Sequence, residues 1–472
     1  MLPCIEKYKV YPSVYPADKE VDVTIIPTGR VHLFREDVEY KLTVTTVDCD
    51  FYGDNAGNQV EYTVKGEGGV LKFKHTFPGE GEHVIFLHFD PEKPPFPLYT
   101  YSLFEDLYKL RPMKGDLHSH SFRSDGLHDP VAIAGHFREQ GYDFAVLSDH
   151  NRYYPSEEMI EGYNGVKLGF TPIRGEEVHA PGGSVLHVVH AGGRGSVTEM
   201  YMKNLEGFEK EIKVYEENLA GSVPDRYLGR YARSKWITDK VKEVGGIAIY
   251  AHPYWRPGQR KLYSTTDELA EIHLKSGFFD AYELVGGMGQ IGNNRSLALW
   301  NKLTAEGLKI SVVGSSDIHH IAPDSTFMYI YTVAFAEDRD ADSIIDAVKA
   351  GRCVAVEATG EEPKCQYRCY GDFRYVSYAH FLLKYFFPEL QRVCQNEGVL
   401  MYQYSMGEAD PKLIELLAEH TEHWRSRFFG IEPPILPSKE ILDFEDKWRA
   451  VQLDGPKTKG GSAFSDVVSM QI

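Results

Sequence analysis

The sequence has no long hydrophobic run. A membrane-spanning helix needs about 18 or more consecutive, mainly apolar residues, and no stretch of this chain has that length. The first residues, Met1-Leu2-Pro3-Cys4-Ile5-Glu6-Lys7, also lack the basic segment followed by an apolar one that marks a secretory signal. We therefore expect a cytoplasmic protein with neither a membrane segment nor a membrane partner.

Cysteine is scarce. The 472 residues include six cysteines, and only Cys365 and Cys369 lie close together. Their spacing matches no zinc-finger pattern, and a chain of this length does not need a disulfide framework to fold. The cysteines are therefore predicted to be free thiols.

Basic residues are fewer than acidic ones. The chain has 51 lysines and arginines against 69 aspartates and glutamates, which gives a formal net charge of -18. No strongly basic segment offsets this charge along the sequence. Because an acidic protein repels a polyanion, the composition argues against nucleic acid as a partner.

The length exceeds what one hydrophobic core usually organises, so two or three domains are expected. Residues 1–108 contain alternating segments of strand length, such as Val21–Ile26 and Tyr40–Val44, separated by glycine and proline turns. This pattern favours a β-sandwich-like domain. His83 and His88 are five residues apart and cannot share one strand face, so we interpret them as surface or edge residues.

Residues 109–359 change to strands that alternate with amphipathic helices. Asp129-Pro130 predicts a helix start, and glycines that favour a left-handed backbone predict helix ends. These glycines are Gly141, Gly245, Gly277, Gly307 and Gly351. Such alternation is typical of an α/β parallel sheet or barrel with right-handed crossovers. The segment from Val197 to Leu219 is longer than a crossover needs, which favours a helical lid or cap.

Residues 360–472 are predicted to form a helical C-terminal region. Asp410-Pro411 opens a helix that should end at Gly430. Aromatic and apolar side chains recur at helical spacing before it, which favours a core or docking face over a ligand site. They are Tyr378, Phe381, Leu382, Tyr385 and Phe386.

Residues that can bind metal are concentrated in the middle region. A single His-x-His is usually a surface pair, but His118 and His120 are followed by many more ligand-type residues. On a strand both imidazoles leave the same face and can reach one ion. Other candidates lie shortly after apolar runs of strand length: Asp149 and His150 after Phe144–Leu147, His252 after Gly246–Ala251, and Asp317 after Ile310–Val313. Gathered at strand C-termini, they predict a polar site on the rim of an α/β layer.

These residues lie in an ordered set of motifs. The motifs are Gly115-Asp116-Leu117-His118-Ser119-His120, Ser124-Asp125-Gly126, Leu147-Ser148-Asp149-His150, Gly175-Glu176-Glu177, Val185-Leu186-His187, Ala251-His252-Pro253 and Gly314-Ser315-Ser316-Asp317-Ile318-His319. The set resembles the motifs of the polymerase-and-histidinol-phosphatase (PHP) family over residues 114–357. Any one motif is weak, whereas the complete ordered set is specific.

The resemblance implies a distorted (β/α)7 barrel with two or three divalent metal ions at the C-terminal ends of its strands. Carried onto this chain, it implies a first ion bound by His118, His120, Glu177 and Asp317, a second bound by Glu177, His187 and His252, and a third bound by Asp125, His150 and His319. It also implies that Glu177, Asp317 and His319 are catalytic. Imidazole and carboxylate ligands suit zinc, manganese or iron better than calcium or magnesium.

Not every candidate fits a family position equally well. Glu176 and Glu177 point to opposite faces of a strand, and the family's Gly-x-Glu spacing selects Glu177. Asp125 stands where some relatives have histidine. Glu283 matches a family carboxylate near the site and is expected to orient a ligand. Four histidines off the motif positions are interpreted as hydrogen-bonded structural residues: His128, His179, His190 and His320.

The predicted function is that of a metal-dependent phosphoesterase acting on a small phosphomonoester. A metal-bridging hydroxide would attack phosphorus in line while an arginine neutralises the developing charge. The arginine candidates are Arg123, Arg174, Arg194 and Arg256, chosen because they lie near the motifs.

Two other functions stay open. The same residues could serve a metal-dependent amidase or lactonase, whose target is a carbonyl group. Alternatively, the chain could be a non-catalytic, metal-stabilised binding or scaffold module, as some PHP domains of DNA polymerases are. Lost ligands would mark the second case, and none is lost here. Neither the substrate nor the oligomeric state follows from the sequence.

Overall fold

In this computed structural model, the described residues are 7–48, 59–181, 186–256, 262–322, 325–359 and 365–453. The chain forms two compact units, one built on Leu103–Ser426 and the other on Cys4–Ser102 with Arg427–Ile472. All predicted metal ligands belong to the larger unit. The division into three independent domains stays a prediction.

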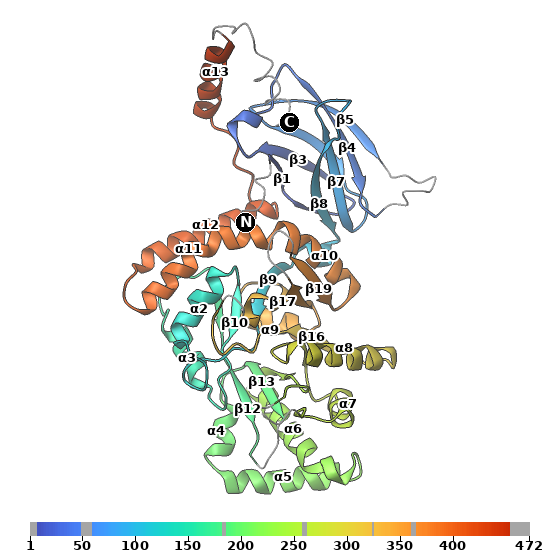
Figure 1. Cartoon of the computed structure of the whole chain (residues 1–472), viewed down its shortest axis with the longest axis vertical. Helices are drawn as coiled ribbons and strands as arrows, with labels where there is room; N and C mark the ends of the chain where they lie inside the picture. The colour runs from blue at the N-terminus through green and yellow to red at the C-terminus, as the bar shows by residue number, and fades with distance from the viewer. Residues whose placement is uncertain are drawn as a thin grey trace. The chain divides into compact units, whose positions relative to one another are not determined.

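The smaller unit contains two β-sheets and a C-terminal helix (Figure 1). One sheet has the order β1 (Tyr8–Tyr11), β3 (Glu20–Pro27), β6 (Leu71–Thr76). The other has the order β2 (Val14–Pro16), β8 (Phe96–Leu103), β7 (Gly81–His88), β4 (Glu39–Thr46), β5 (Val60–Lys65). Strands β3, β4 and β7 run antiparallel to their neighbours. Alternate side chains of both sheets, among them Ile25 and Leu42, share one apolar core because a strand turns every second side chain inward.

A short 3-10 helix, η1 (Arg30–His32), and α13 (Lys439–Leu453) complete the smaller unit. The guanidinium of Arg30 lies 4.5 Å from the ring centroid of Phe444 on α13. This cation–π contact helps to hold the helix on the β-rich part.

The prediction that His83 lies at the surface is wrong. Its side chain is 1% exposed, and its Nε2 lies 2.7 Å from Ser102 Oγ. Burial, with a smaller effect of His75, lowers the pKa of His83 to about 4. Strand β7 has neighbours on both sides, and a hydroxyl partner allows a histidine there to be buried.

The larger unit is a mixed α/β structure with two sheets. The six-stranded sheet has the order β11 (Thr171–Ile173), β10 (Phe144–Val146), β9 (Arg111–Asp116), β17 (Ile330–Ala336), β18 (Cys353–Thr359), β19 (Gln366–Tyr370). The five-stranded sheet has the order β12 (Gly175–His179), β13 (His187–Gly192), β14 (Gly246–Tyr250), β15 (Ala281–Val285), β16 (Ser311–Gly314). Strands β9, β10 and β11 are parallel, as are β14, β15 and β16. In contrast, β13 runs antiparallel to both neighbours, and so does β17.

The two sheets are connected by isolated bridges. Ser119 pairs with Ile318, and His150 pairs with Glu177, both in the parallel direction. Apolar side chains from both sheets, including Val146 and Val313, form one core cluster. The described strands thus form two sheets joined by isolated bridges and not one continuous sheet. The closed (β/α)7 barrel therefore stays a prediction.

Helices flank these sheets, and five of them end just before a predicted stop glycine. The helices are α1 (Glu105–Tyr108), α2 (Pro130–Glu139), α3 (Tyr154–Glu161), α4 (Val197–Met202), α5 (Leu205–Leu219), α6 (Asp225–Glu243), α7 (Asp267–Lys275), α8 (Gly289–Ala305) and α9 (Ala341–Lys349), with the 3-10 helix η3 (Thr326–Met328). The Asp129 side chain caps α2 by accepting hydrogen bonds from the backbone N–H groups of Val131 and Ala132. All five predicted stop glycines have positive φ. Within the described residues, no helix is long and apolar enough to span a bilayer.

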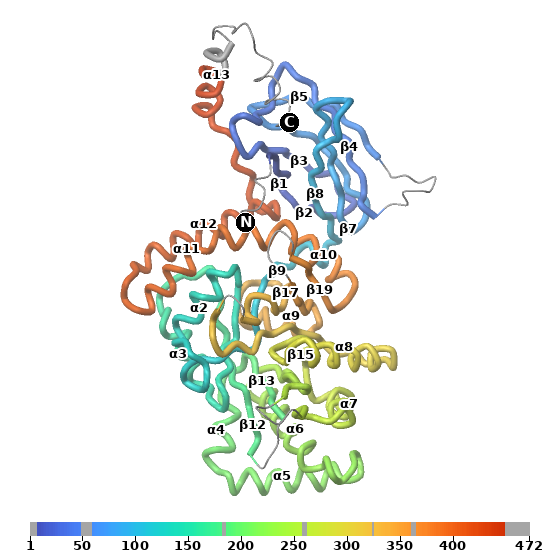
Figure 2. Tube along the Cα trace, viewed as in Figure 1, coloured from blue at the N-terminus to red at the C-terminus, as the bar shows by residue number. Residues whose placement is uncertain are grey.

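Three further helices pack within the larger unit: α10 (Phe373–Tyr385), α11 (Phe387–Ser405) and α12 (Pro411–Phe428), of which α12 continues to the edge of the unit. Figure 2 shows α11 beside α2. Gly135 and Gly398 allow this close approach, because a Cβ atom at either position would clash with the backbone of the other helix. At the same interface, the buried Arg138 Nε donates to Glu397 Oε2 at 2.8 Å. The described Cys353, Cys369 and Cys394 are free thiols, as expected.

Candidate metal centre

The structure brings all nine predicted metal ligands together at the ends of neighbouring strands. His118 and His120 follow β9, His150 follows β10, Glu177 lies in β12, His187 begins β13, His252 follows β14, and Asp317 and His319 follow β16. The two isolated bridges hold these strand ends side by side. One pairs the ligands His150 and Glu177, and the other pairs Ser119 with Ile318, which are the neighbours of ligands. Asp125 reaches the same place from the loop after His120.

One group of ligand atoms is buried, although the side chain of Asp317 is 12% exposed. His118 Nε2 lies 3.4 Å from Glu177 Oε2 and 3.4 Å from Asp317 Oδ1. His120 Nε2 lies 3.5 Å from the same Glu177 oxygen and 3.1 Å from the same Asp317 oxygen. Two imidazoles and two carboxylates thus converge, as predicted for the first ion.

Glu177 offers its other carboxylate oxygen to a second group. Glu177 Oε1 lies 2.6 Å from His187 Nδ1 and 3.1 Å from His252 Nε2. The two oxygens of one carboxylate therefore face different histidines. This is the arrangement that a bridging carboxylate requires.

A third group lies at the more exposed edge. Asp125 Oδ2 is 3.3 Å from His150 Nε2, and Asp125 Oδ1 is 3.3 Å from His319 Nε2. The His120 ring stacks on His319 with centroids 4.4 Å apart. Together with His120, these residues place one ligand atom each within 4.8 Å of one another.

The donor set fits divalent cations. His118 Nε2, His187 Nδ1 and Glu177 Oε2 are buried and have no hydrogen-bond partner among the described residues, although ligand atoms surround them. Buried polar atoms rarely stay unpaired, and lone pairs that converge from imidazole and carboxylate groups suit zinc, manganese or iron. Burial alone would raise the pKa of Glu177, but the nearby His187 and His118 lower it well below its usual value. A lowered pKa favours the ionised carboxylate, which is the form that binds a metal ion.

Glu283 orients the first of these histidines. This residue of β15 is fully buried, and its Oε2 accepts a hydrogen bond from His118 Nδ1 at 2.8 Å. The contact leaves His118 Nε2 facing Glu177 and Asp317. A carboxylate behind a ligating histidine fixes the ring and raises its basicity, which agrees with the orienting role expected from the sequence.

Replacing Glu283 with glutamine should weaken metal binding about 10- to 100-fold, because outer partners of metal ligands have effects of this size. Competition with a chelator, followed by the metal retained per chain, measures the change. Glu268→Gln on α7 is the matched control, since Glu268 is paired with Arg226 away from the cluster. Equal metal retention by the Glu283 variant and wild type would contradict the orienting role.

Glu176 points away from the metal ligands that surround Glu177. Its carboxylate accepts hydrogen bonds from Ser196 Oγ at 3.0 Å and from Val197 N at 2.5 Å, at the start of α4. It also lies 3.3 Å from His190 Nδ1. The structure therefore directs Glu176 to the helix and Glu177 to the metal ligands, as the alternation of side chains on a strand requires.

Two ligands lie in backbone conformations that few non-glycine residues adopt. His252 has a φ of 21° and Asp317 a φ of 52°. Asp317 N donates to His118 O, which ties its loop to the end of β9. Such strained positions persist where the surrounding structure holds them, and they cluster at functional sites. The motifs alone did not reveal them.

One histidine interpreted as structural lies inside the cluster. His179 Nε2 is 3.5 Å from Glu177 Oε2 and 3.0 Å from His150 Nδ1. The sequence feature that could have identified His179 is its position two residues after Glu177 on the same predicted strand. In contrast, His128 Nε2 accepts a hydrogen bond from Ile321 N, and His190 lies beside Glu176. His320 is exposed.

The structure does not single out a phosphate-binding arginine. Arg123 forms a bidentate ion pair with Glu158 at 2.7 and 2.9 Å, and Arg256 donates to Tyr263 Oη at 2.9 Å. The Arg194 side chain is 82% exposed. Arg174 is partly exposed and stays a candidate without an assigned contact.

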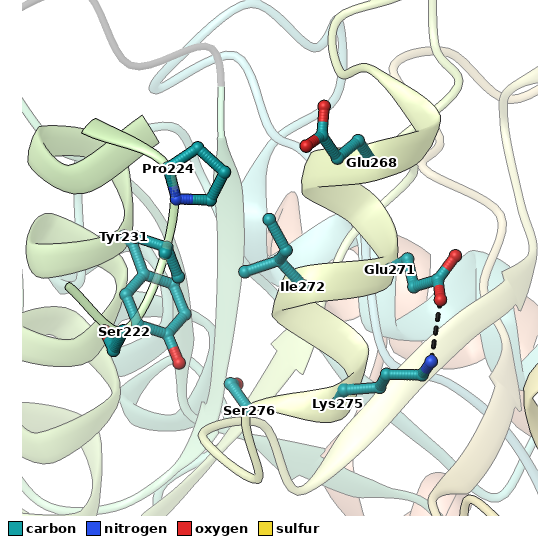
Figure 3. A pocket seen from close by; sticks show the side chains of 9 residues that line it. Ser222, Pro224, Tyr231, Glu268, Glu271, Ile272, Lys275 and Ser276 are labelled. Atoms are coloured by element: carbon teal, nitrogen blue, oxygen red, sulfur yellow. Dashed lines mark hydrogen bonds and ion pairs between the residues drawn. The ribbon is translucent and has the colours of Figure 1, made fainter. Parts of the chain in front are cut away.

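A separate pocket of about 660 Å³ lies between α7 and the segment that joins α5 to α6 (Figure 3). Pro224, Tyr231 and Ile272 form part of its wall, and an ion pair of Glu271 and Lys275 at 2.7 Å lies along one side. None of the metal-ligand candidates lines it. This pocket is therefore distinct from the candidate metal centre.

Comparison with known proteins found no matching family model and no matching curated protein. Among solved structures, a two-domain protein from Bacteroides vulgatus containing a predicted PHP-like metal-dependent phosphoesterase is similar over 52% of this chain, with 19% identity and a TM-score of 0.36. This chain spans 65% of the length of that protein. A protein from Bifidobacterium adolescentis named for metal-dependent phosphoesterase activity shares 17% identity over 45% of this chain and 89% of its own, with a TM-score of 0.32. An amidohydrolase from Chromobacterium violaceum, with bound sulfate and no metal, shares 17% identity over the same proportions, with a TM-score of 0.30. At these TM-scores the likenesses do not establish a common fold.

Proposed function

We propose that the larger unit is a metal-dependent phosphoesterase that hydrolyses a small phosphomonoester. The observation that carries this proposal is the position of Glu177, whose two oxygens face separate sets of histidines. When bound, two or three ions of zinc, manganese or iron would supply Lewis acidity and an activated water. The motif resemblance to the PHP family supports the same reaction class and a (β/α)7 arrangement of the strands.

The residues of the centre differ in exposure, so the centre has a buried end and a solvent-exposed edge. His118, Glu177 and Glu283 are fully buried, whereas the side chains of Asp125 and His319 are 54% and 35% exposed. A substrate therefore approaches from the edge formed by Asp125 and His319. His319 Nδ1 donates to Asp317 O at 2.9 Å, which turns its Nε2 toward Asp125 and that edge.

The buried end of the centre holds the ligands in place. Asp116 Oδ1 accepts hydrogen bonds from the backbone N–H groups of His118 and Ser316, at 3.0 and 3.1 Å. Asp149 accepts from Ser121 N and from the hydroxyls of Ser121 and Ser124, which shapes the loop that carries Asp125. Preorganised ligands of this kind avoid a reorganisation cost during the reaction.

The proposed substrate is a small anion, because the net charge of -18 disfavours a polymeric one. The test loads the full chain with zinc, manganese or iron and compares kcat/KM for sugar phosphates, mononucleotides and short oligonucleotides. Small phosphomonoesters should be hydrolysed fastest. A clear preference for oligonucleotides would contradict the proposed substrate class.

The same experiment includes an amide and a lactone panel. Cleavage of these substrates without phosphoester hydrolysis would replace the proposal with the amidase or lactonase function. A fully loaded protein that turns over no substrate in either panel would favour a metal-stabilised binding role. Glu177→Gln, treated in parallel, controls for contaminating phosphatase.

A further inference from the structure

His179 occupies a position that the predicted set of nine ligands does not use. It is the last residue of β12, two residues beyond Glu177, so both side chains leave the same face of the strand. In the antiparallel ladder it is directly opposite His187. The two rings are nearly parallel, with centroids 3.7 Å apart and an interplanar angle of 16°. His179 therefore lies against a ligand of the second group.

The ring nitrogen of His179 points at two other ligand atoms. Its Nε2 lies 3.0 Å from His150 Nδ1 and 3.5 Å from Glu177 Oε2, and His150 Nδ1 lies 2.6 Å from the same oxygen. All three atoms lie within 4.8 Å of one another. Glu177 Oε2 has no hydrogen-bond partner among the described residues. Two imidazole nitrogens and a carboxylate oxygen that converge in this way fit one divalent cation.

The backbone N–H and C=O groups of His179 both have side-chain hydrogen-bond partners. His179 N donates to Asn151 Oδ1 at 2.9 Å, and Tyr201 Oη lies within donor distance of both Asn151 Oδ1 and His179 O, at 2.7 and 3.0 Å. Asn151 has a φ of 51°, and Tyr201, on α4, is 4% exposed. The strand end is therefore fixed by a loop and a helix. A side chain with only a surface role does not require such positioning.

His150 has two alternative sets of partners. Its Nε2 faces Asp125, and its Nδ1 faces Glu177 and His179. A ligating histidine uses one ring nitrogen for the metal and the other for an orienting hydrogen bond. The set around Nδ1 provides three ligand atoms for a metal ion only if His179 takes part, because Glu177 and His150 alone provide two.

We propose that His179 is a direct metal ligand that binds, through Nε2, a divalent transition-metal ion shared with Glu177 Oε2 and His150 Nδ1. This rests on the metal centre of the proposed function but not on the reaction that the centre catalyses. The alternative is a positioning role, in which His179 only orients His150 through their mutual hydrogen bond.

The test compares wild type, His179→Asn and the control His420→Asn, all as full chains. His420 is an exposed histidine on α12 that belongs to none of the ligand groups. Each protein is loaded with zinc or manganese, dialysed against a graded chelator and analysed for metal per chain. The cobalt-loaded forms are compared by visible absorption, which reports the number and type of ligands. Circular dichroism checks folding, and His179→Gln replaces the asparagine variant if that variant does not fold.

We expect His179→Asn to lose one class of ions at a chelator concentration at least about tenfold lower than wild type does, because even outer partners of ligands have effects of that size. Its cobalt spectrum should change, whereas His420→Asn should match wild type in both measurements. If His179→Asn retained metal as wild type does and its cobalt spectrum were unchanged, the proposal would be overturned even if activity fell. That result leaves only the positioning role. A wild-type protein that binds no metal would instead refute the metal centre itself, so the two failures are distinguishable.

Discussion

Replacing Glu177 with glutamine is expected to abolish turnover while the chain stays folded. The amide keeps the size of the side chain but loses the charge that faces histidines on both sides. A bound metal contributes several kcal/mol of transition-state stabilisation, and each tenfold in rate corresponds to about 1.4 kcal/mol. The loss in kcat should therefore be at least about a thousandfold. Steady-state kinetics with a phosphomonoester substrate and metal analysis of the same sample provide the measurement.

Glu176→Gln is the contrasting variant for this experiment. Glu176 accepts hydrogen bonds at the start of α4 and does not face the ligand groups. Its replacement should lower the free energy of unfolding but leave the metal content of the folded protein near that of wild type. If Glu177→Gln kept near-normal activity while Glu176→Gln lost it, the bridging role would have to pass to Glu176.

Removing the metal should lower both activity and thermal stability. The loaded protein is expected to hold two or three divalent ions per chain, because the ligand atoms of all three predicted ions converge at the centre. An ion that binds only the folded state at about 100 times its dissociation constant stabilises that state by about 2.7 kcal/mol. Elemental analysis gives the stoichiometry, and thermal unfolding before and after chelation gives the shift in Tm.

Calcium provides the control for this measurement. It prefers six to eight oxygen ligands, whereas the centre is rich in imidazole, so calcium should restore little stability to the stripped protein. Zinc, manganese or iron should restore most of it. Less than one ion per chain after reconstitution with all three metals would contradict the predicted centre.

The smaller unit shows how far alternation along a strand can be used for prediction. The inward residues of β4 include Tyr40, Leu42 and Val44, and their period of two in the sequence predicted a strand with one buried face. His83 did not fit that pattern. It is buried because β8 brings Ser102 next to its ring, and the sequence gives no measure of which strand pairs with which.

The C-terminal helices show the same limit. Asp410-Pro411 and Gly430 marked the ends of a helix correctly, since capping depends on neighbouring residues. Which helices pack against one another could not be predicted. Gly135 and Gly398 are far apart in the sequence, and only the packed pair of helices shows that both are needed for a close approach.

For this protein, the sequence by itself determined the positions of several helix ends, the periodicity of strands and the residue types of the candidate metal centre, because each depends on chemistry within a few residues. Only the tertiary structure decided the antiparallel directions of β13 and β17, the burial of His83 and the convergence of His179 on Glu177 and His150. These features depend on strand pairing and loop closure between distant segments. Their free energies come from the assembled core and its hydrogen bonds, which no local pattern contains.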